Sequence, residues 1–364
     1  MKVKEVIKII EDFAPLHYAE SFDNVGLIVG NAEAEVKGVL VSLDTLETTV
    51  DEAIEKNCNL IVSFHPIIFK GLTKIVGKSY VEKVVLKAIK HDIHIYAIHT
   101  ALDNHSMGVS AKMAEKLGLN KTKILIPKSG QIKKLTTYVP VKYGEELRNA
   151  LFEVGAGQIG NYDHCSFNWQ GVGTFRGNDV SNPAIGEIGQ DHMEEEMCIQ
   201  VIFEHHLENK ILQAMRENHP YEEVAYEVVT LDNVHQKIGM GIIGELDEEK
   251  TVPDFLNQLK ETFHLKMVRH SDSLQKKIKK VAVLGGSGSF AIKNAISAGA
   301  DIYVTADLKY HDFFQAEGKI VLADIGHYES EQFTKNLLVE LLSKKITNFA
   351  IILSENNTNP INYY

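Results

Sequence analysis

The chain alternates short apolar runs with amphipathic segments in its first and last thirds, and this alternation constrains the fold more than any other feature. The apolar runs have the length of β-strands, and the segments between them carry apolar residues at helical spacing. The runs are residues 36–43, 60–63 and 93–98, and later residues 279–284, 301–305 and 320–322. Strands that alternate with helices predict an α/β fold with a largely parallel sheet, whose right-handed crossovers place helices on both faces.

The middle third follows a different order. From about residue 133 the pattern reads strand, helix, strand, strand, helix, strand, which suits a small ferredoxin-like α+β domain. We therefore expect a discontinuous outer domain, residues 1–128 and 236–364, made of two βαβ-type halves. The α+β domain, residues 129–235, interrupts it as an insertion.

Length and composition narrow the class of protein. At 364 residues, with 44% hydrophobic and 24% charged residues, the chain fits a soluble globular protein of two or three domains. No apolar stretch approaches the roughly 18 residues that span a bilayer. A net charge of −11 disfavours general nucleic-acid binding, which needs clustered Lys and Arg. The three cysteines form no CxxC pair, and the N-terminus leads directly into an amphipathic helix, so we expect a cytoplasmic protein without signal peptide or membrane anchor.

Polar side chains follow the ends of several predicted strands. Asp44, His65, His99 and Asp103 come directly after strands of the first third, where ligands of parallel sheets bind. In the last third, His327 and Glu331 lie four residues apart, so a helix projects both from one face. Taken singly, His65 could be a hydrogen-bonded strand-end histidine, His99 a structural residue and Asp103 a turn cap. Together they suggest a metal site assembled from both ends of the chain.

A glycine-rich turn at the junction of a strand and a helix offers a second candidate site. Gly285, Gly286, Ser287 and Gly288 could bind an anion through backbone amides and the helix dipole. A tight packing turn is the alternative, because the turn lacks a complete GxGxxG pattern. Asp307, at another strand end, and His311 could line a site nearby. The glycines of residues 155–160 are better explained as a flexible connection, and the His205-His206 pair as a solvated turn.

Several of these motifs together resemble the Nif-three-like family, including its YbgI and YqfO types, often called GTP cyclohydrolase I type 2 homologs. The motifs are residues 21–27, 63–71, 99–103, 285–288 and 324–331, and the resemblance covers essentially the whole chain. The middle insert resembles the PII/CutA-like domain of the longer members. The resemblance implies a dinuclear centre, commonly zinc or iron, in a toroidal homohexamer. Its ligands would be His65, Asp103, His327 and Glu331.

This sequence departs from the family pattern at Phe64. The family usually has two consecutive histidines before the proline, and phenylalanine cannot coordinate a metal. The site would then hold one divalent ion tightly and a second weakly or not at all, or would recruit His99, His311 or water. Zinc is the first candidate, with iron or manganese as alternatives.

Two classes of function follow from the sequence. The first is a metal-dependent hydrolase acting on a nucleotide or another small phosphate-containing molecule. In it, His99 would shuttle protons or orient a ligand. The second is a non-enzymatic regulator that responds to metal or nucleotide, or a scaffold ring. For either function we expect a small-molecule ligand as the partner.

Overall fold

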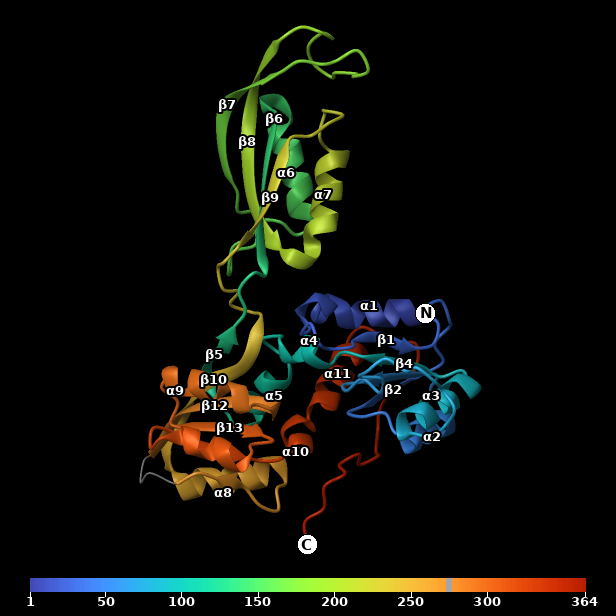
Figure 1. Ribbon diagram of the computed structural model, residues 1–364, viewed down its shortest axis with the longest axis vertical. Helices are drawn as coiled ribbons and strands as arrows, with labels where there is room; N and C mark the ends of the chain where they lie inside the picture. Colours follow the sequence, from blue (N-terminus) through green and yellow to red (C-terminus); the bar gives the residue numbers. More distant parts are fainter. Residues whose placement is uncertain (273–276) are drawn as a thin grey trace. The chain divides into compact units, whose positions relative to one another are not determined.

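The computed structural model describes residues 1–272 and 277–364, which form two compact units (Figure 1). The larger unit is discontinuous and consists of Met1–Ile126 and Lys237–Tyr364, whereas the smaller unit is Pro127–Gln236. The larger unit holds two sheets and the smaller unit holds one, so the structure confirms a mixed α/β fold. No helix in the described ranges is both long and apolar enough to cross a lipid bilayer.

The first sheet of the larger unit has five strands in the order β1-β4-β3-β2-β15. Strands β15, β2, β3 and β4 run parallel, and β1 pairs with β4 in the antiparallel sense. The strands are β1 (Gly26–Val29), β2 (Val39–Ser42), β3 (Leu60–Ser63), β4 (His94–Ala97) and β15 (Ile351–Leu353). The helices of this half are α1 (Val3–Phe13), α2 (Glu47–Glu55), α3 (Tyr80–Lys90), α4 (His99–Asp103) and α11 (Thr334–Ser343).

Both faces of this sheet are covered, which explains its continuous apolar strands. Successive side chains of a strand point to opposite faces. Leu60 and Val62 of β3 therefore pack in the cluster that contains residues of α1 and α11, whereas Ile61 packs with residues of α2 and α3. With both faces buried, the carboxyl ends of the strands remain for polar residues.

The second sheet has the order β11-β14-β13-β12-β10-β5. Its centre, β12, β13 and β14, is parallel, whereas β10 and β11 pair antiparallel with their neighbours. The strands are β5 (Asn120–Pro127), β10 (Gly239–Thr251), β11 (Arg269–His270), β12 (Lys277–Ser287), β13 (Ile302–Ala306) and β14 (Val321–Asp324). The helices are α5 (Val109–Lys116), α8 (Val252–Phe263), α9 (Ile292–Ser297) and α10 (His327–Glu331), with a 3-10 helix at Tyr310–Ala316.

The smaller unit contains one antiparallel sheet in the order β7-β8-β6-β9. Helices α6 and α7 lie on one face of this sheet (Figure 1) and bury Leu147, Leu151, Ile211 and Met215 against it. The elements are β6 (Ile132–Pro140), α6 (Gly144–Glu153), β7 (Phe167–Phe175), β8 (His192–Glu204), α7 (Glu208–Glu217) and β9 (Tyr226–Leu231).

Candidate metal centre

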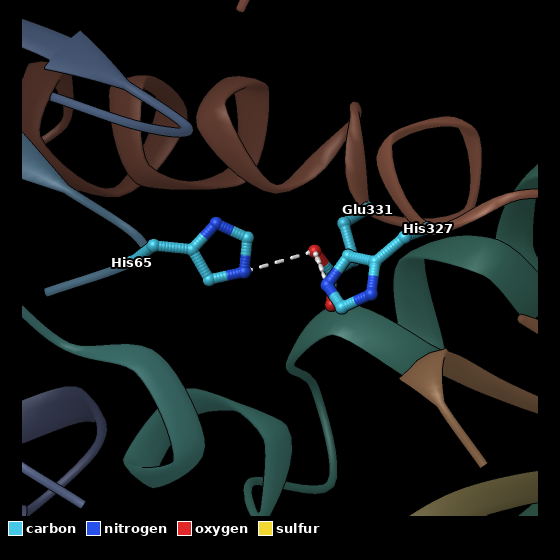
Figure 2. Close-up of side chains that lie close together, drawn as sticks. All are labelled: His65, His327 and Glu331. Atoms are coloured by element: carbon cyan, nitrogen blue, oxygen red, sulfur yellow. Dashed lines mark ion pairs between the residues drawn. The ribbon is translucent and has the colours of Figure 1, made fainter. Parts of the chain in front are cut away.

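Two histidines and one carboxylate converge within the larger unit. Figure 2 shows the rings of His65 and His327 on either side of the Glu331 carboxylate. Glu331 Oε2 lies 3.2 Å from Nε2 of His65 and 3.2 Å from Nε2 of His327. One ligand atom from each of the three residues lies within 4.8 Å of the others. The structure thus brings together three of the four ligands predicted from the sequence.

Local structure fixes where each of these side chains points. His65 comes two residues after β3, and Pro66 biases it toward an extended backbone. His327 and Glu331 begin and end the one-turn helix α10, so their side chains project from one face. Gly326 precedes this helix with φ 91°, a backbone conformation that other residues rarely adopt.

The second ring nitrogen of each histidine forms a hydrogen bond with its own aspartate. The Asp44 carboxylate lies 2.8 Å from His65 Nδ1, and the Asp307 carboxylate lies 2.8 Å from His327 Nδ1. A carboxylate can only accept there, so each Nδ1 carries the donated hydrogen. When such a ring is otherwise neutral, its lone pair is on Nε2, the atom that faces Glu331. This carboxylate–histidine arrangement is the usual support for a metal-binding imidazole.

Glu331 Oε2 is buried, and its nearest polar partners among the described residues are the Nε2 atoms of His65 and His327, each at 3.2 Å. An isolated buried carboxylate is costly, so this oxygen needs positive charge beside it. Burial alone would raise the pKa of Glu331, but His327 and His65 outweigh burial and lower it to about 2. A divalent cation between the three donors would supply the same charge, so these residues fit a metal ion.

The pKa values of the two histidines shift upward, opposite to the pKa of Glu331. Burial alone would lower the pKa of both rings. For His65, Asp44 and Glu331 outweigh burial and raise the pKa to about 10. For His327, Asp307 and Glu331 raise the pKa to about 11. In the protein without metal, the two Nε2 atoms that would bind an ion therefore carry protons.

Asp103, the fourth predicted ligand, ends helix α4 and does not belong to the group of three converging donors. Burial and the charge of Glu331 raise its pKa well above the usual range, while the charges of His65 and His327 lower it. The charges of all three residues therefore act on the Asp103 carboxyl. A nearby cation would favour its ionised form.

His99 forms a third aspartate–histidine pair. Its Nδ1 lies 2.8 Å from Asp23, whose second carboxylate oxygen accepts from the backbone and hydroxyl of Thr100. The centroid of the His99 ring lies 5.2 Å from that of His65. Asp23 was present in the sequence motif of residues 21–27, but nothing in the residue pattern linked it to His99.

Phe64 is fully buried and packs against both neighbouring histidines. Its ring centroid lies 4.9 Å from that of His65 and 5.5 Å from that of His99. An apolar ring therefore adjoins the donors. His311 contacts Tyr310 and Phe314 and is outside the converging group.

The predicted anion turn has another role. Gly285 and Gly286 continue β12 instead of ending it, and their amides donate to Ser110 and Ser330. The amide of Gly288 donates to the Ala306 carbonyl, so at least three of the four amides are not free for an anion. Gly286 has φ 69°, and a Cβ there would lie 2.4 Å from Glu331 Oε1. These contacts favour the packing alternative.

A cavity of about 520 Å³ opens beside the centre and contains His65 and His327 in its wall. Arg269 and Tyr328 line it together with residues of the C-terminal segment that follows β15. In that segment the Thr358 hydroxyl donates to Asp44 at 2.5 Å, and Asn359 donates to Glu329 at 2.9 Å. The sequence did not predict this segment at the site because it has no apolar periodicity.

Known proteins resemble this chain along its whole length. A family model described as Duf34/NIF3 (NGG1p interacting factor 3) matches residues 1–360. A Bacillus subtilis (strain 168) protein called GTP cyclohydrolase 1 type 2 homolog is 37% identical over 370 residues, covering 99% of this chain and 98% of its own. A protein of the same name from Halalkalibacterium halodurans is 38% identical over 364 residues, or 98% of each chain.

A solved structure agrees with these sequence matches. The crystal structure of a Bacillus cereus protein related to NIF3 has a TM-score of 0.86 and 39% sequence identity to this chain. The match covers 100% of this chain and 99% of the Bacillus cereus chain. The chain therefore belongs to the Duf34/NIF3 family, as its motifs predicted.

Proposed function

We propose that this chain binds a divalent metal ion through His65, His327 and Glu331, with Asp103 beside them, and uses it to hydrolyse a small molecule. The observation that carries the proposal is Glu331 Oε2, a buried oxygen that lies 3.2 Å from the Nε2 atoms of two histidines and has no other polar partner in the part of the chain that the structure describes. Two nitrogens and carboxylate oxygens suit zinc first, and iron or manganese as alternatives.

The number of ions depends on Phe64. Three donors converge among residues 1–272 and 277–364, and the apolar ring of Phe64 lies next to them, which favours one tightly held ion per chain. Phe64→His should add a second equivalent of metal, whereas Phe64→Leu should not. Equal metal content in both variants and the wild type would mean that another residue already serves a second ion.

When bound, a divalent ion in such a site lowers the pKa of water toward neutrality and so supplies a nucleophile for hydrolysis. The protein's part is to hold the donors and move protons. Asp44 and Asp307 keep the imidazoles of His65 and His327 oriented. Asp23 orients His99 in the same way, and this leaves His99 Nε2 to accept or deliver a proton.

The cavity beside the centre sets the class of substrate. Its volume of about 520 Å³ lies within the usual range for small-molecule sites. The Arg269 guanidinium in its wall already donates to Asp324 at 3.1 Å and to the Leu308 carbonyl at 2.9 Å, so a divalent cation at the centre would be the main group that attracts phosphate or carboxylate oxygens of a substrate. We therefore propose a nucleotide or another phosphate-containing small molecule, in keeping with the names of the relatives.

A non-enzymatic regulator or scaffold remains the second candidate function, and the smaller unit favours it. Its element order, with strands arranged β7-β8-β6-β9, suits a ferredoxin-like domain of the PII/CutA-like kind. Such a domain would bind an effector or support assembly into a homohexamer. We propose the cytoplasm as the compartment for either function.

Metal analysis of the purified full chain tests the first proposal. Wild type should carry about one zinc, iron or manganese per chain, and His327→Ala and Asp103→Ala should lower this content. His311→Ala is the matched control, because its ring lies outside the converging group. Loss of metal from the control alone, or none in wild type, would refute the centre. Hydrolysis of nucleotides by wild type and not by His327→Ala would then separate enzyme from regulator.

A further inference from the structure

A second cavity, of about 830 Å³, belongs entirely to the smaller unit and is not part of the metal centre. It lies on the sheet face opposite α6 and α7. Ile199 and Val201 of β8 pack beneath these helices, so the alternate residues Glu196 and Cys198 point to the other face. The cavity therefore occupies the face of the sheet that the helices leave uncovered.

Two glycines of β7 create the floor of this cavity. Gly171 is paired with Glu196 across the sheet, and a Cβ at Gly171 would meet no atom within 4 Å. A Cβ at Gly173 would instead lie 2.2 Å from Glu196 Oε2. The carboxylate of Glu196 therefore lies across Gly173, and the missing side chains leave room above the sheet.

Aromatic rings form the walls around this carboxylate. Tyr138, Trp169, Phe175 and Tyr221 all line the cavity, and the rings of Phe175 and Tyr221 have centroids 5.8 Å apart. The Tyr221 hydroxyl donates to Glu196 Oε1 at 2.8 Å. Burial and the Glu196 carboxylate raise the pKa of Tyr221, which keeps this hydroxyl protonated as a donor. The carboxylate is thus held in place inside an aromatic enclosure.

The charges at the cavity favour a positively charged occupant. Glu196, Glu222 and Glu223 are acidic residues of the lining, and the Glu222 carboxylate accepts from the Asn182 backbone amide at 2.7 Å. Arg176 also lines the cavity, but its guanidinium donates to both oxygens of Asp191, at 2.8 and 2.6 Å. Phosphate groups would meet this excess of carboxylates, whereas aromatic faces and carboxylates both attract cations.

We propose that this cavity binds an organic cation of the alkylammonium class, with Glu196 as the counter-ion and the rings of Trp169 and Phe175 against its apolar groups. The volume suits a small molecule. The site does not depend on the metal centre, because every residue that lines it lies in the smaller unit.

The only tryptophan of the chain, Trp169, reports on this cavity. Choline chloride, titrated into the full-length protein at constant ionic strength, should change its fluorescence in a saturable way. The neutral analogue 3,3-dimethyl-1-butanol has the same shape without the charge and should bind at least about tenfold more weakly, since a desolvated cation–aromatic contact contributes that much. Equal binding of the two, or a response to nucleotides instead of choline, would overturn the proposal.

Two variants test whether Glu196 is the counter-ion of the bound cation. Glu196→Gln keeps the size of the side chain but removes its charge, and should weaken choline binding by about tenfold. Glu195→Gln is the matched control, because Glu195 is the next residue of β8, is exposed and does not line the cavity. Far-UV circular dichroism confirms folding of both variants. Equal affinities for the two would show that Glu196 is not the counter-ion, and the proposed site would be wrong.

Discussion

The protonation of His65 and His327 would link the proposed metal binding to pH. Both rings have pKa values far above the ordinary 6.5, at about 10 and about 11, because aspartates and Glu331 outweigh the effect of burial. At neutral pH the metal-free rings are therefore protonated on both nitrogens. A metal ion binds only the deprotonated Nε2, so it must displace these protons.

Metal binding at pH 7 is accordingly expected to release up to about two protons per ion. Isothermal titration calorimetry in buffers of different ionisation enthalpy measures this number directly, and His327→Ala should release fewer. The two raised pKa values also stabilise the metal-free fold. That stability is fully present below about pH 6.5 and disappears as pH rises through about 10 to 11. A binding enthalpy that is the same in every buffer would contradict this account.

Gly286 has no side chain and so leaves room for the Glu331 carboxylate, and replacing this glycine tests the close contact. Gly286→Ala adds a Cβ 2.4 Å from Glu331 Oε1 and strains a backbone with φ 69°. We expect loss of metal and destabilisation by about 1–3 kcal/mol in denaturant unfolding. Gly299→Ala is the control. It has a similar φ of 74°, but its nearest atom is Lys280 Nζ at 3.7 Å. Metal loss in both variants would attribute the effect to backbone strain instead of to Glu331.

A residue of the centre could be predicted from the sequence where a local rule, such as helix spacing, determines its position. The four-residue spacing of His327 and Glu331 predicted one helix face, and α10 has that face. The partners Asp23 and Thr358 were not predictable in this way. Their contacts with His99 and Asp44 join segments far apart in the chain, and no local pattern encodes them.

The C-terminal segment after β15 acts on the centre through one hydroxyl. Thr358 donates to Asp44, which in turn holds His65. Thr358→Val keeps the shape but removes this donor, so metal affinity should fall by about tenfold, as for other residues that support a ligand. Competition with a chromophoric chelator measures this affinity. Thr45→Val is the matched control, because the buried Thr45 hydroxyl has no hydrogen-bond partner among the residues that the structure describes. A larger loss of affinity in the control would refute the role of Thr358.

Elements with clear apolar periodicity were predicted well, and elements rich in glycine were not. Strand β3 has the predicted bounds, and α1 is the amphipathic helix expected at the N-terminus. The predicted turn after residue 284 is instead strand, because Gly285 and Gly286 let β12 pass closely beside α5 and α10. Close packing with distant segments therefore decided the course of β12.

The smaller unit leaves and rejoins the larger one through two neighbouring strands, β5 and β10. Gly241 packs against Leu125, and Gly244 packs against Asn120, so these strands run antiparallel. Replacing residues 128–236 by a short Asn-Gly turn should therefore leave a folded protein with unchanged metal content per chain. The same deletion carrying His327→Ala is the control and should lack metal. A deletion variant that folds but binds no metal would show that the smaller unit supports the centre.

The sequence predicted a change of architecture in the middle of the chain because the order of its elements changes there. It did not predict β5 or the full length of β10. Strand β5 contains two lysines and β10 contains glycines and charged residues, and their pairing within the second sheet depends on contacts between distant segments. Such pairing depends on tertiary contacts more than on local propensity.

The donors of the proposed centre come from the two sheets of the larger unit. His65 follows β3 of the first sheet, whereas His327 and Glu331 follow β14 of the second. Neither sheet alone holds the complete set, so any motion that separates the two sheets would divide the ligands of a bound ion. A radioactive zinc exchange experiment could follow such a motion in the native protein.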